Sequence, residues 1–239
     1  MTSYMTQQAI QVDSSDLEST LSPSEMDLRR QLVRFGRWVH RLGYTPGTAG
    51  NLSVRLDDHL ILATPTGCSK ALLHPTDMVI VDNQGHKLSG LRNVTSEIGM
   101  HLAVYRMRPD IQAIVHTHPP IATAFAACGK ALDQPICAEI IMTTGLVPLA
   151  PYATTGTEEV GVSLEPFIAD HDAILLANHG LLTYGSSLPD AFMKTETVEH
   201  FAQVCLSAHQ LGGAQPLRAA DIEKLQRARA RYASNSSCR

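Results

Sequence analysis

One segment, residues 111–120, constrains the chain more than any other, because it carries two histidines at the end of a predicted buried strand. Residues 111–115 are a mostly apolar run rich in β-branched residues, which predicts such a strand. His116 and His118 follow it two residues apart, so an extended backbone places both imidazoles on the same face. Two neutral imidazoles on one face favour a transition-metal ion, although such a pair can also be simply hydrogen-bonded at the rim of a sheet.

A second predicted strand, residues 173–177, also delivers a histidine at its end. His179 follows this strand almost directly, and Gly180 is expected to let the backbone turn tightly behind it. The ends of two buried strands thus supply three candidate ligands, His116, His118 and His179. Three protein ligands with one open position is the arrangement of a catalytic zinc ion. The remaining histidines have no such placement and are expected at the surface or in packing.

Composition limits the kinds of protein that this chain can be. Its 239 residues, 44% of them hydrophobic, are enough for one large α/β domain. The net charge of −4 and the lack of a basic run give no electrostatic case for nucleic acid or an anionic membrane. Five scattered cysteines without a C-x-x-C pair indicate reduced thiols, and no apolar run approaches the ~20 residues that span a bilayer. We therefore expect a soluble cytoplasmic protein, and the low charged fraction, 18%, favours an oligomer.

The pattern of apolar runs and turn residues predicts one domain over residues 22–233, between a mobile N-terminal tail (1–21) and a frayed C-terminus (234–239). The predicted strands are 52–55, 60–63, 78–82, 111–115, 135–142, 146–149 and 173–177. The predicted helices are 22–42, 95–108, 121–128, 158–169, 187–212 and 220–232. Strands interleaved with helices in this way indicate the α/β class.

Two loops and one helix start are suited to binding an anion. Loops 45–51 and 64–69 are rich in small residues, which let backbone N–H groups approach an anion closely, although each alone is more often a plain turn. Thr95 is the predicted N-cap of helix 95–108, so Ser96 and Glu97 would lie in its first turn, where free N–H groups favour anions. Glu97 can act on a substrate there or merely stabilise the helix, and His101 is expected to pack.

These features together define a class of reaction. A carboxylate beside a Lewis-acid metal ion can move a proton next to a carbonyl group. The residues alone therefore predict a metal-assisted lyase or isomerase that acts on a small anionic carbonyl compound.

Five short segments are similar to the class II aldolase/adducin family, in that family's order and spacing. They are 48–53 (TAGNLS), 64–67 (TPTG), 95–97 (TSE), 116–118 (HTH) and 178–180 (NHG). The resemblance covers about residues 24–232 and implies a three-layer α/β/α fold with a largely antiparallel central sheet. It also implies a cyclic homotetramer with its sites between neighbouring subunits.

The resemblance to the fuculose-1-phosphate aldolase branch implies a role for each matching residue. Zinc, or another divalent ion, would be bound by His116, His118 and His179, with Glu97 as the acid/base. Tyr232 resembles a C-terminal tyrosine that donates a proton in the neighbouring subunit's site, although a tyrosine at a frayed end fits the sequence equally well. The reaction would cleave a ketose 1-phosphate to dihydroxyacetone phosphate and a small aldehyde. The substrate phosphate would be held by Gly50, Asn51, Thr66, Gly67, Thr95 and Ser96.

Other branches of the family leave alternatives open. The ribulose-phosphate 4-epimerases have an aspartate where Glu97 stands, and some members are decarboxylases of acidic substrates with the same zinc site. The methylthioribulose-phosphate dehydratases carry their glutamate about twenty residues past the His-x-His motif, near Glu139. That residue lies in a predicted apolar strand, where a carboxylate needs a partner unless it faces solvent at the sheet edge. The aldolases often have an aromatic hydroxyl in this region, which is absent here. The adducin head keeps the fold as an assembly module without the metal histidines.

Overall fold

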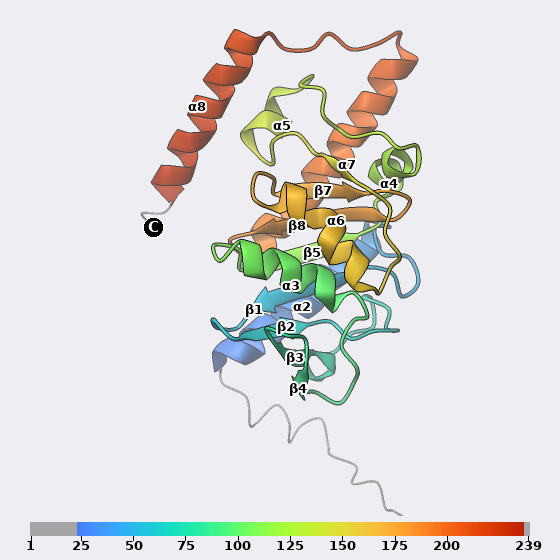
Figure 1. Ribbon diagram of the computed structural model, residues 1–239, viewed down its shortest axis with the longest axis vertical. Helices are drawn as coiled ribbons and strands as arrows, with labels where there is room; N and C mark the ends of the chain where they lie inside the picture. Colours follow the sequence, from blue (N-terminus) through green and yellow to red (C-terminus); the bar gives the residue numbers. More distant parts are fainter. Residues whose placement is uncertain (1–22, 237–239) are drawn as a thin grey trace, which may run out of the picture.

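An eight-stranded sheet forms the centre of the protein, for which the computed structural model describes residues 23–236, with side chains from 24 to 231. The strand order is β4-β3-β2-β1-β5-β8-β7-β6, and every neighbouring pair is antiparallel except β6 and β7. Figure 1 shows the strands crossing the middle of the molecule. Their bounds are β1 Asn51–Arg55, β2 Leu60–Ala63, β3 Val79–Asp82, β4 Lys87–Ser89, β5 Ala113–Thr117, β6 Leu149–Ala150, β7 Ala173–Leu176 and β8 Gly180–Gly185.

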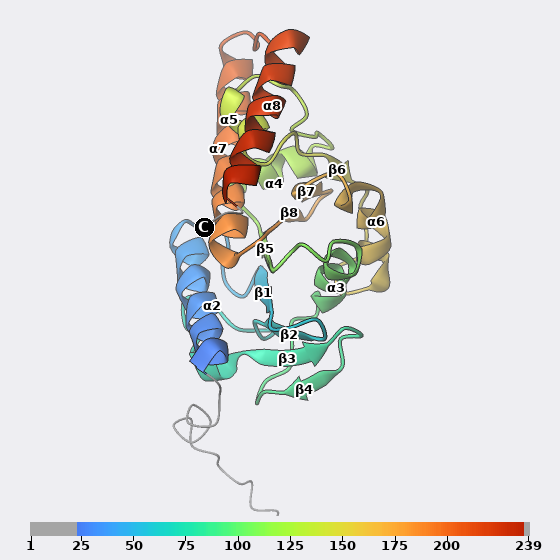
Figure 2. The same ribbon diagram turned by 90° about the vertical axis from the view of Figure 1, so that its left-hand side faces the viewer.

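Helices cover both faces of this sheet. Helices α3 and α6 lie on one face, and α2 and α7 lie on the other, as the side view in Figure 2 shows. This arrangement confirms the predicted three-layer α/β/α fold with a largely antiparallel sheet. The bounds are α2 Pro23–Arg41, η1 Pro75–Asp77, α3 Ile98–Met107, α4 Pro120–Ala127, α5 Ala138–Met142, α6 Glu158–Ile168, α7 Leu188–Gln210 and α8 Ala219–Ser236.

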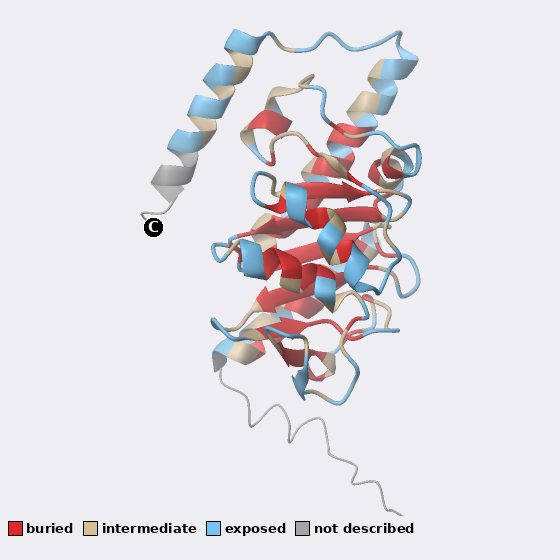
Figure 3. Ribbon diagram, viewed as in Figure 1, coloured by how far each residue is buried: buried red, intermediate tan, exposed pale blue. Residues whose placement is uncertain are grey.

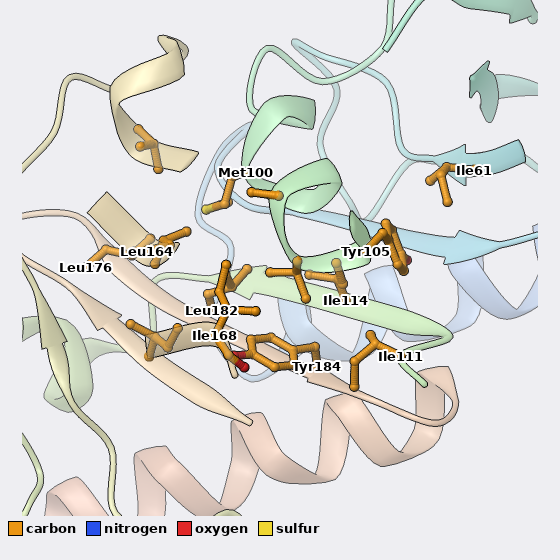
Figure 4. Packing of buried hydrophobic residues seen from close by; sticks show 14 of the residues in the cluster. Ile61, Met100, Tyr105, Ile111, Ile114, Leu164, Ile168, Leu176, Leu182 and Tyr184 are labelled. Carbon is orange, nitrogen blue, oxygen red and sulfur yellow. The ribbon is translucent and has the colours of Figure 1, made fainter. Parts of the chain in front are cut away.

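Strand β5 lies at the centre of the sheet because its side chains are apolar on both faces. Ile114 packs in the cluster beneath α3 and α6, whereas Ala113 and Val115 point to the opposite face, toward α2 and α7. This is the alternation that a strand requires, and all five residues of β5 are buried. Figure 3 shows the sheet as the most deeply buried layer, and Figure 4 shows the packing around Ile114. A buried strand therefore carries His116, and His118 follows directly after its last residue.

Two regions differ from the sequence-based prediction. Residues 135–142, predicted as a strand, contain the short helix α5, whose Ile140 and Ile141 are buried near side chains of α7 and α8. A short apolar run has the same composition in a buried strand and in a buried helix, so packing decides between them. Strands β4 and β8 are absent from the prediction, and β6 begins at the last residue of the predicted strand 146–149. Glu139 is exposed in the first turn of α5, not buried in a strand.

Helix α3 begins at Ile98, with Glu97 instead of Thr95 at the N-cap position. The backbone N–H of Thr95 donates to the carbonyl oxygen of Thr64, and an isolated bridge pairs Val94 with Pro65. An N-cap residue is itself extended, and Thr95 keeps the contact of a cap, since its Oγ1 accepts a hydrogen bond from the N–H of Glu97 at 3.3 Å. The chain then makes a tight turn, in which the N–H of Ile98 donates to the carbonyl oxygen of Thr95 at 3.2 Å, before the helix begins. The prediction that Ser96 and Glu97 lie in the first turn is therefore wrong.

The structure describes only part of the two ends of the chain. Helix α8 continues to Ser236, beyond the predicted end at residue 232, and the predicted N-terminal tail lies outside the described residues. None of the helices in the described residues is both long enough and apolar enough to cross a membrane.

Candidate metal centre

The three predicted histidine ligands meet at one point between two neighbouring strands. Strand β5 pairs with β8, and His116 lies opposite Leu182 in that register. His179 precedes β8 directly, so the pairing places it beside the end of β5. One ring nitrogen from each of His116, His118 and His179 can be chosen so that all three lie within 4.8 Å of one another. The structure therefore brings together imidazoles that are more than sixty positions apart in the sequence.

Hydrogen bonding assigns the tautomer of His116. Its Nδ1 lies 3.0 Å from the carbonyl oxygen of Leu181, and because a carbonyl only accepts, Nδ1 carries the proton. The lone pair of Nε2 is then free, and this atom lies 3.1 Å from Nε2 of His118. Burial lowers the pKa of His118 to about 4 and holds that of His116 well below its ordinary value. Both rings are thus neutral at pH 7, which is the form that binds a metal ion.

The tight turn between β7 and β8 positions His179. The N–H of His179 donates to the carbonyl oxygen of Leu176 at 3.0 Å, and Asn178 adopts a left-handed conformation with φ of 55°. Asparagine tolerates that conformation better than most residues. The residue that makes the turn is therefore Asn178, not Gly180 as predicted. Gly180 has a different role, because a Cβ there would lie 2.6 Å from Cδ2 of His118.

Glu97 faces the histidine cluster from the start of α3. Its Oε1 is 3.2 Å from Nε2 of His179, and its Oε2 is 3.5 Å from Nε2 of His116. Oε2 accepts a hydrogen bond from Nδ2 of Asn51 at 2.8 Å, whereas Oε1 is buried without a hydrogen-bond donor. Burial raises the pKa of the Glu97 carboxyl, but the facing His116, His179 and Asn51 outweigh burial and leave this pKa below its usual value.

This donor set fits a divalent cation. Three imidazole nitrogens converge on one point, and a buried carboxylate oxygen beside them has no donor of its own. Zinc prefers nitrogen and carboxylate ligands in a four-coordinate arrangement, and three histidines leave one position open for a substrate. The residues present are therefore those of a metal-binding site.

His101, which was expected only to pack, connects Asn51 to the core. Its Nε2 lies 2.6 Å from Oδ1 of Asn51, and since an amide oxygen only accepts, Nε2 must donate. Nδ1 then accepts from the hydroxyl of Ser53 at 2.7 Å, and Ser53 accepts from the hydroxyl of Tyr105 at 2.9 Å. Burial lowers the pKa of His101 to about 4, so the ring stays neutral. These bonds fix the amide of Asn51 with its NH₂ group toward Glu97.

The predicted anion-binding residues lie together in the wall of the pocket that opens beside this cluster. The cavity, about 680 Å³ in volume, is bordered by Glu97, His118 and His179. Gly50 packs so tightly that a Cβ would lie 2.7 Å from the carbonyl oxygen of His116, so no larger residue fits there. The six predicted phosphate-binding residues all line this cavity: Gly50, Asn51, Thr66, Gly67, Thr95 and Ser96.

The pocket also contains residues that were not predicted, and one candidate residue lies outside it. Lys70, Thr155 and Gly156 also line the pocket, and the sequence offers no periodic signal that would have identified them. Glu139 is exposed on α5 and does not border this cavity. The side chain of Tyr232 lies outside the described residues, so its predicted role stays a prediction.

Comparison with known proteins identifies one protein family and several enzymes that are similar to this chain. A sequence model of the family described as Class II Aldolase and Adducin N-terminal domain matches residues 30–206. The 5-deoxy-D-ribulose 1-phosphate aldolase of Bacillus thuringiensis serovar kurstaki is 35% identical over 199 residues, which cover 82% of this chain and 92% of that protein. The 3-oxo-tetronate 4-phosphate decarboxylase of Escherichia coli (strain K12) is 37% identical over 191 residues, covering 78% and 89%. A solved L-fuculose 1-phosphate aldolase superposes with a TM-score of 0.80 at 32% identity, covering 87% of this chain and 97% of that one.

Proposed function

The chain belongs to the class II aldolase/adducin family, and on that premise we propose that it is a zinc-dependent aldolase. It cleaves a ketose 1-phosphate, similar to fuculose 1-phosphate, into dihydroxyacetone phosphate and a small aldehyde. The observation that carries this proposal is the meeting of three imidazoles and Glu97 beside one pocket that is also lined by two small-residue loops. Relatives that are named as aldolases of 1-phosphate sugars support the same reading.

Each part of the site has a defined task in this reaction. His116, His118 and His179 would hold zinc, which supplies a Lewis acid that polarises the substrate carbonyl. Asn51 holds Oε2 of Glu97, so Oε1, which has no donor, is the oxygen free to take up and return a proton. The loops of the pocket wall would bind the phosphate through backbone N–H and hydroxyl groups. As implied by the resemblance, Tyr232 would donate a proton in the neighbouring site of a homotetramer.

Decarboxylation of a phosphorylated 3-oxo acid is the second candidate. It is favoured by relatives named as 3-oxo-tetronate 4-phosphate decarboxylases, which are 36–37% identical to this chain. The same metal centre and the same phosphate-binding loops serve either reaction, because both polarise a carbonyl next to the bond that breaks. The two differ only in whether an aldehyde or carbon dioxide leaves.

The other three alternatives, a dehydratase, an epimerase and a non-catalytic module, have less support. A dehydratase would need Glu139 at the substrate, but this residue is exposed outside the pocket. An epimerase would have an aspartate at the position of Glu97. A module without catalytic function, such as the adducin head, would not need the three metal histidines, which converge here.

The test is a product assay on the zinc-loaded protein with a panel of ketose 1-phosphates and phosphorylated 3-oxo acids. We expect dihydroxyacetone phosphate from at least one ketose 1-phosphate, and Glu97→Gln should abolish its release while zinc remains bound. Release of carbon dioxide from a 3-oxo acid instead would establish the second candidate. Turnover of neither class would refute both.

A further inference from the structure

Lys70 is a buried cation in the wall of the pocket that contains the histidine cluster. The residue is 1% exposed, yet it borders the same cavity as His118 and His179. Its Nζ donates one hydrogen bond to the carbonyl oxygen of Thr48 at 3.0 Å and another to that of Cys68 at 2.8 Å. These carbonyls belong to the two small-residue loops, so the ammonium group ties the loops together.

This ammonium group has no counter-charge at ion-pair distance in the part of the chain that the structure describes. Its hydrogen bonds go to carbonyl oxygens, and Cys68 and then Glu97 attract it electrostatically without forming an ion pair with it. Burial lowers its pKa to about 8 despite that attraction. Arg29, a second cation with 1% exposure, shows the usual arrangement, since its guanidinium lies 2.7 Å from the carboxylate of Glu25. A buried charge is costly without a partner, so Lys70 lacks a negative charge that a ligand can supply.

The loops around Lys70 provide hydrogen-bond donors but no formal charge. The six residues to which the family resemblance assigns the substrate phosphate are glycines, threonines, a serine and an asparagine, all neutral. Hydrogen bonds to an anion are about twice as strong when the donor is itself charged. An ammonium group has three N–H donors, and two of those on Lys70 are directed at carbonyls. The third remains for an oxygen of a bound anion.

We propose that Lys70 is the charge-recognition residue of the substrate pocket, and that its ammonium group binds the phosphate of a phosphorylated substrate. The neutral loops fix the position of the phosphate, and Lys70 makes the pocket prefer a phosphorylated sugar over the same sugar without phosphate. This rests on the proposed function only in identifying the anion as a substrate phosphate. It does not depend on which bond the enzyme breaks.

Two substitutions separate the charge of Lys70 from its bridging of the loops. Lys70→Gln keeps an NH₂ group that can donate to the loop carbonyls but removes the charge, whereas Lys70→Met removes both. Lys130→Gln is the matched control, because Lys130 is exposed and borders a different cavity. The probe is inorganic phosphate, titrated calorimetrically into the zinc-loaded full chain, with sodium chloride at equal ionic strength as the blank.

We expect Lys70→Gln and Lys70→Met both to weaken phosphate binding about 10- to 100-fold, the usual effect of losing a charged hydrogen bond, and Lys130→Gln to leave it unchanged. Wild-type affinity in Lys70→Gln would overturn the proposal, whether or not Lys70→Met binds, because only bridging would then matter. Failure of the wild-type protein to bind phosphate would overturn it as well.

A second measurement needs no variant of Lys70 and applies if both variants fail to fold. In ¹⁵N-lysine spectra of the wild-type protein, phosphate should shift one buried ammonium signal and leave the exposed ones in place. Equal small shifts of all lysine signals would overturn the proposal. A protein that binds phosphate through Lys70 but cleaves no ketose 1-phosphate would refute the proposed function alone.

Discussion

Gly180→Ala is the smallest change that should disturb the metal centre. A Cβ at this position would lie 2.6 Å from Cδ2 of His118, 2.6 Å from the carbonyl oxygen of Thr117 and 3.4 Å from Cε1 of His116. The first two distances are shorter than van der Waals contact, and one of them is to backbone that cannot move freely in the central strand β5. The added methyl group must therefore displace the His118 ring or separate β5 from β8.

The size of the effect follows from this geometry. Overpacking of a well-packed site costs about 1–3 kcal/mol, which lowers Tm by roughly 2–12 °C in a chain of this length. Displacing one of three ligands should also lower zinc affinity, by about 10- to 100-fold if the loss matches that of a supporting group. Zinc titration of metal-stripped protein and thermal melts with and without zinc measure both quantities.

Gly161→Ala is the matched control for this substitution. Its Cβ would lie 3.5 Å from Cβ of Ala103, an ordinary contact, and Gly161 is inside helix α6, where alanine is favoured by about 1 kcal/mol. We expect this variant to bind zinc normally and to melt at the wild-type temperature or above. If Gly180→Ala also binds zinc and melts like the wild type, the close packing between the β7–β8 turn and His118 is wrong.

Further predictions concern His101 and Glu139. His101→Phe leaves Oδ1 of Asn51 and the hydroxyl of Ser53 without their partner, so unfolding by urea should show a loss of about 2–6 kcal/mol, and kcat should fall while zinc content stays constant. Since the folded pKa of His101 is about 4 against an ordinary 6.5, its neutral form stabilises the fold fully above pH 6.5, and roughly 3 kcal/mol is lost as pH falls to 4. A pH series of urea unfolding should show a loss of stability that is larger in the wild type than in His101→Phe by about this amount, because the buried His116 and His118 lose stability on acidification in both proteins. Glu139→Gln should leave kcat and KM within twofold of the wild type, because the side chain is exposed outside the pocket; abolished turnover would revive the dehydratase alternative.

The elements that carry the metal ligands were predictable because their sequence signals are local. The strand predicted at 111–115 is found two residues further on, at Ala113–Thr117, and the strand predicted at 173–177 is found at Ala173–Leu176. Both are short apolar runs rich in Ile, Val or Leu and bounded by turn residues or prolines, the pattern typical of a buried strand. The His-x-His spacing requires only an extended backbone to place two imidazoles together. The family, the layered fold and the convergence of three histidines were therefore accessible from sequence, and the structure and the comparisons bear them out.

What could not be predicted depends on contacts between distant segments. The meeting of His179 with His116 was predicted, but the contact that produces it, the pairing of β5 with β8, involves a strand absent from the prediction. Helix α3 begins at Ile98 after a tight turn from Thr95, whose N–H pairs with the distant Thr64. His101 looks like any helical packing residue until the β1 strand brings Asn51 and Ser53 beside it. In each case the sequence contains the residues, and the tertiary fold alone gives them their partners.

The most direct test of the account is the zinc content of the purified protein and of three single variants. We predict about one zinc ion per wild-type chain, and loss of that zinc in each of His116→Ala, His118→Ala and His179→Ala while the far-ultraviolet circular dichroism remains that of the folded protein. A wild-type chain that binds no zinc, or a His179→Ala variant that retains it at full affinity, would contradict the claim that these three imidazoles form one metal site.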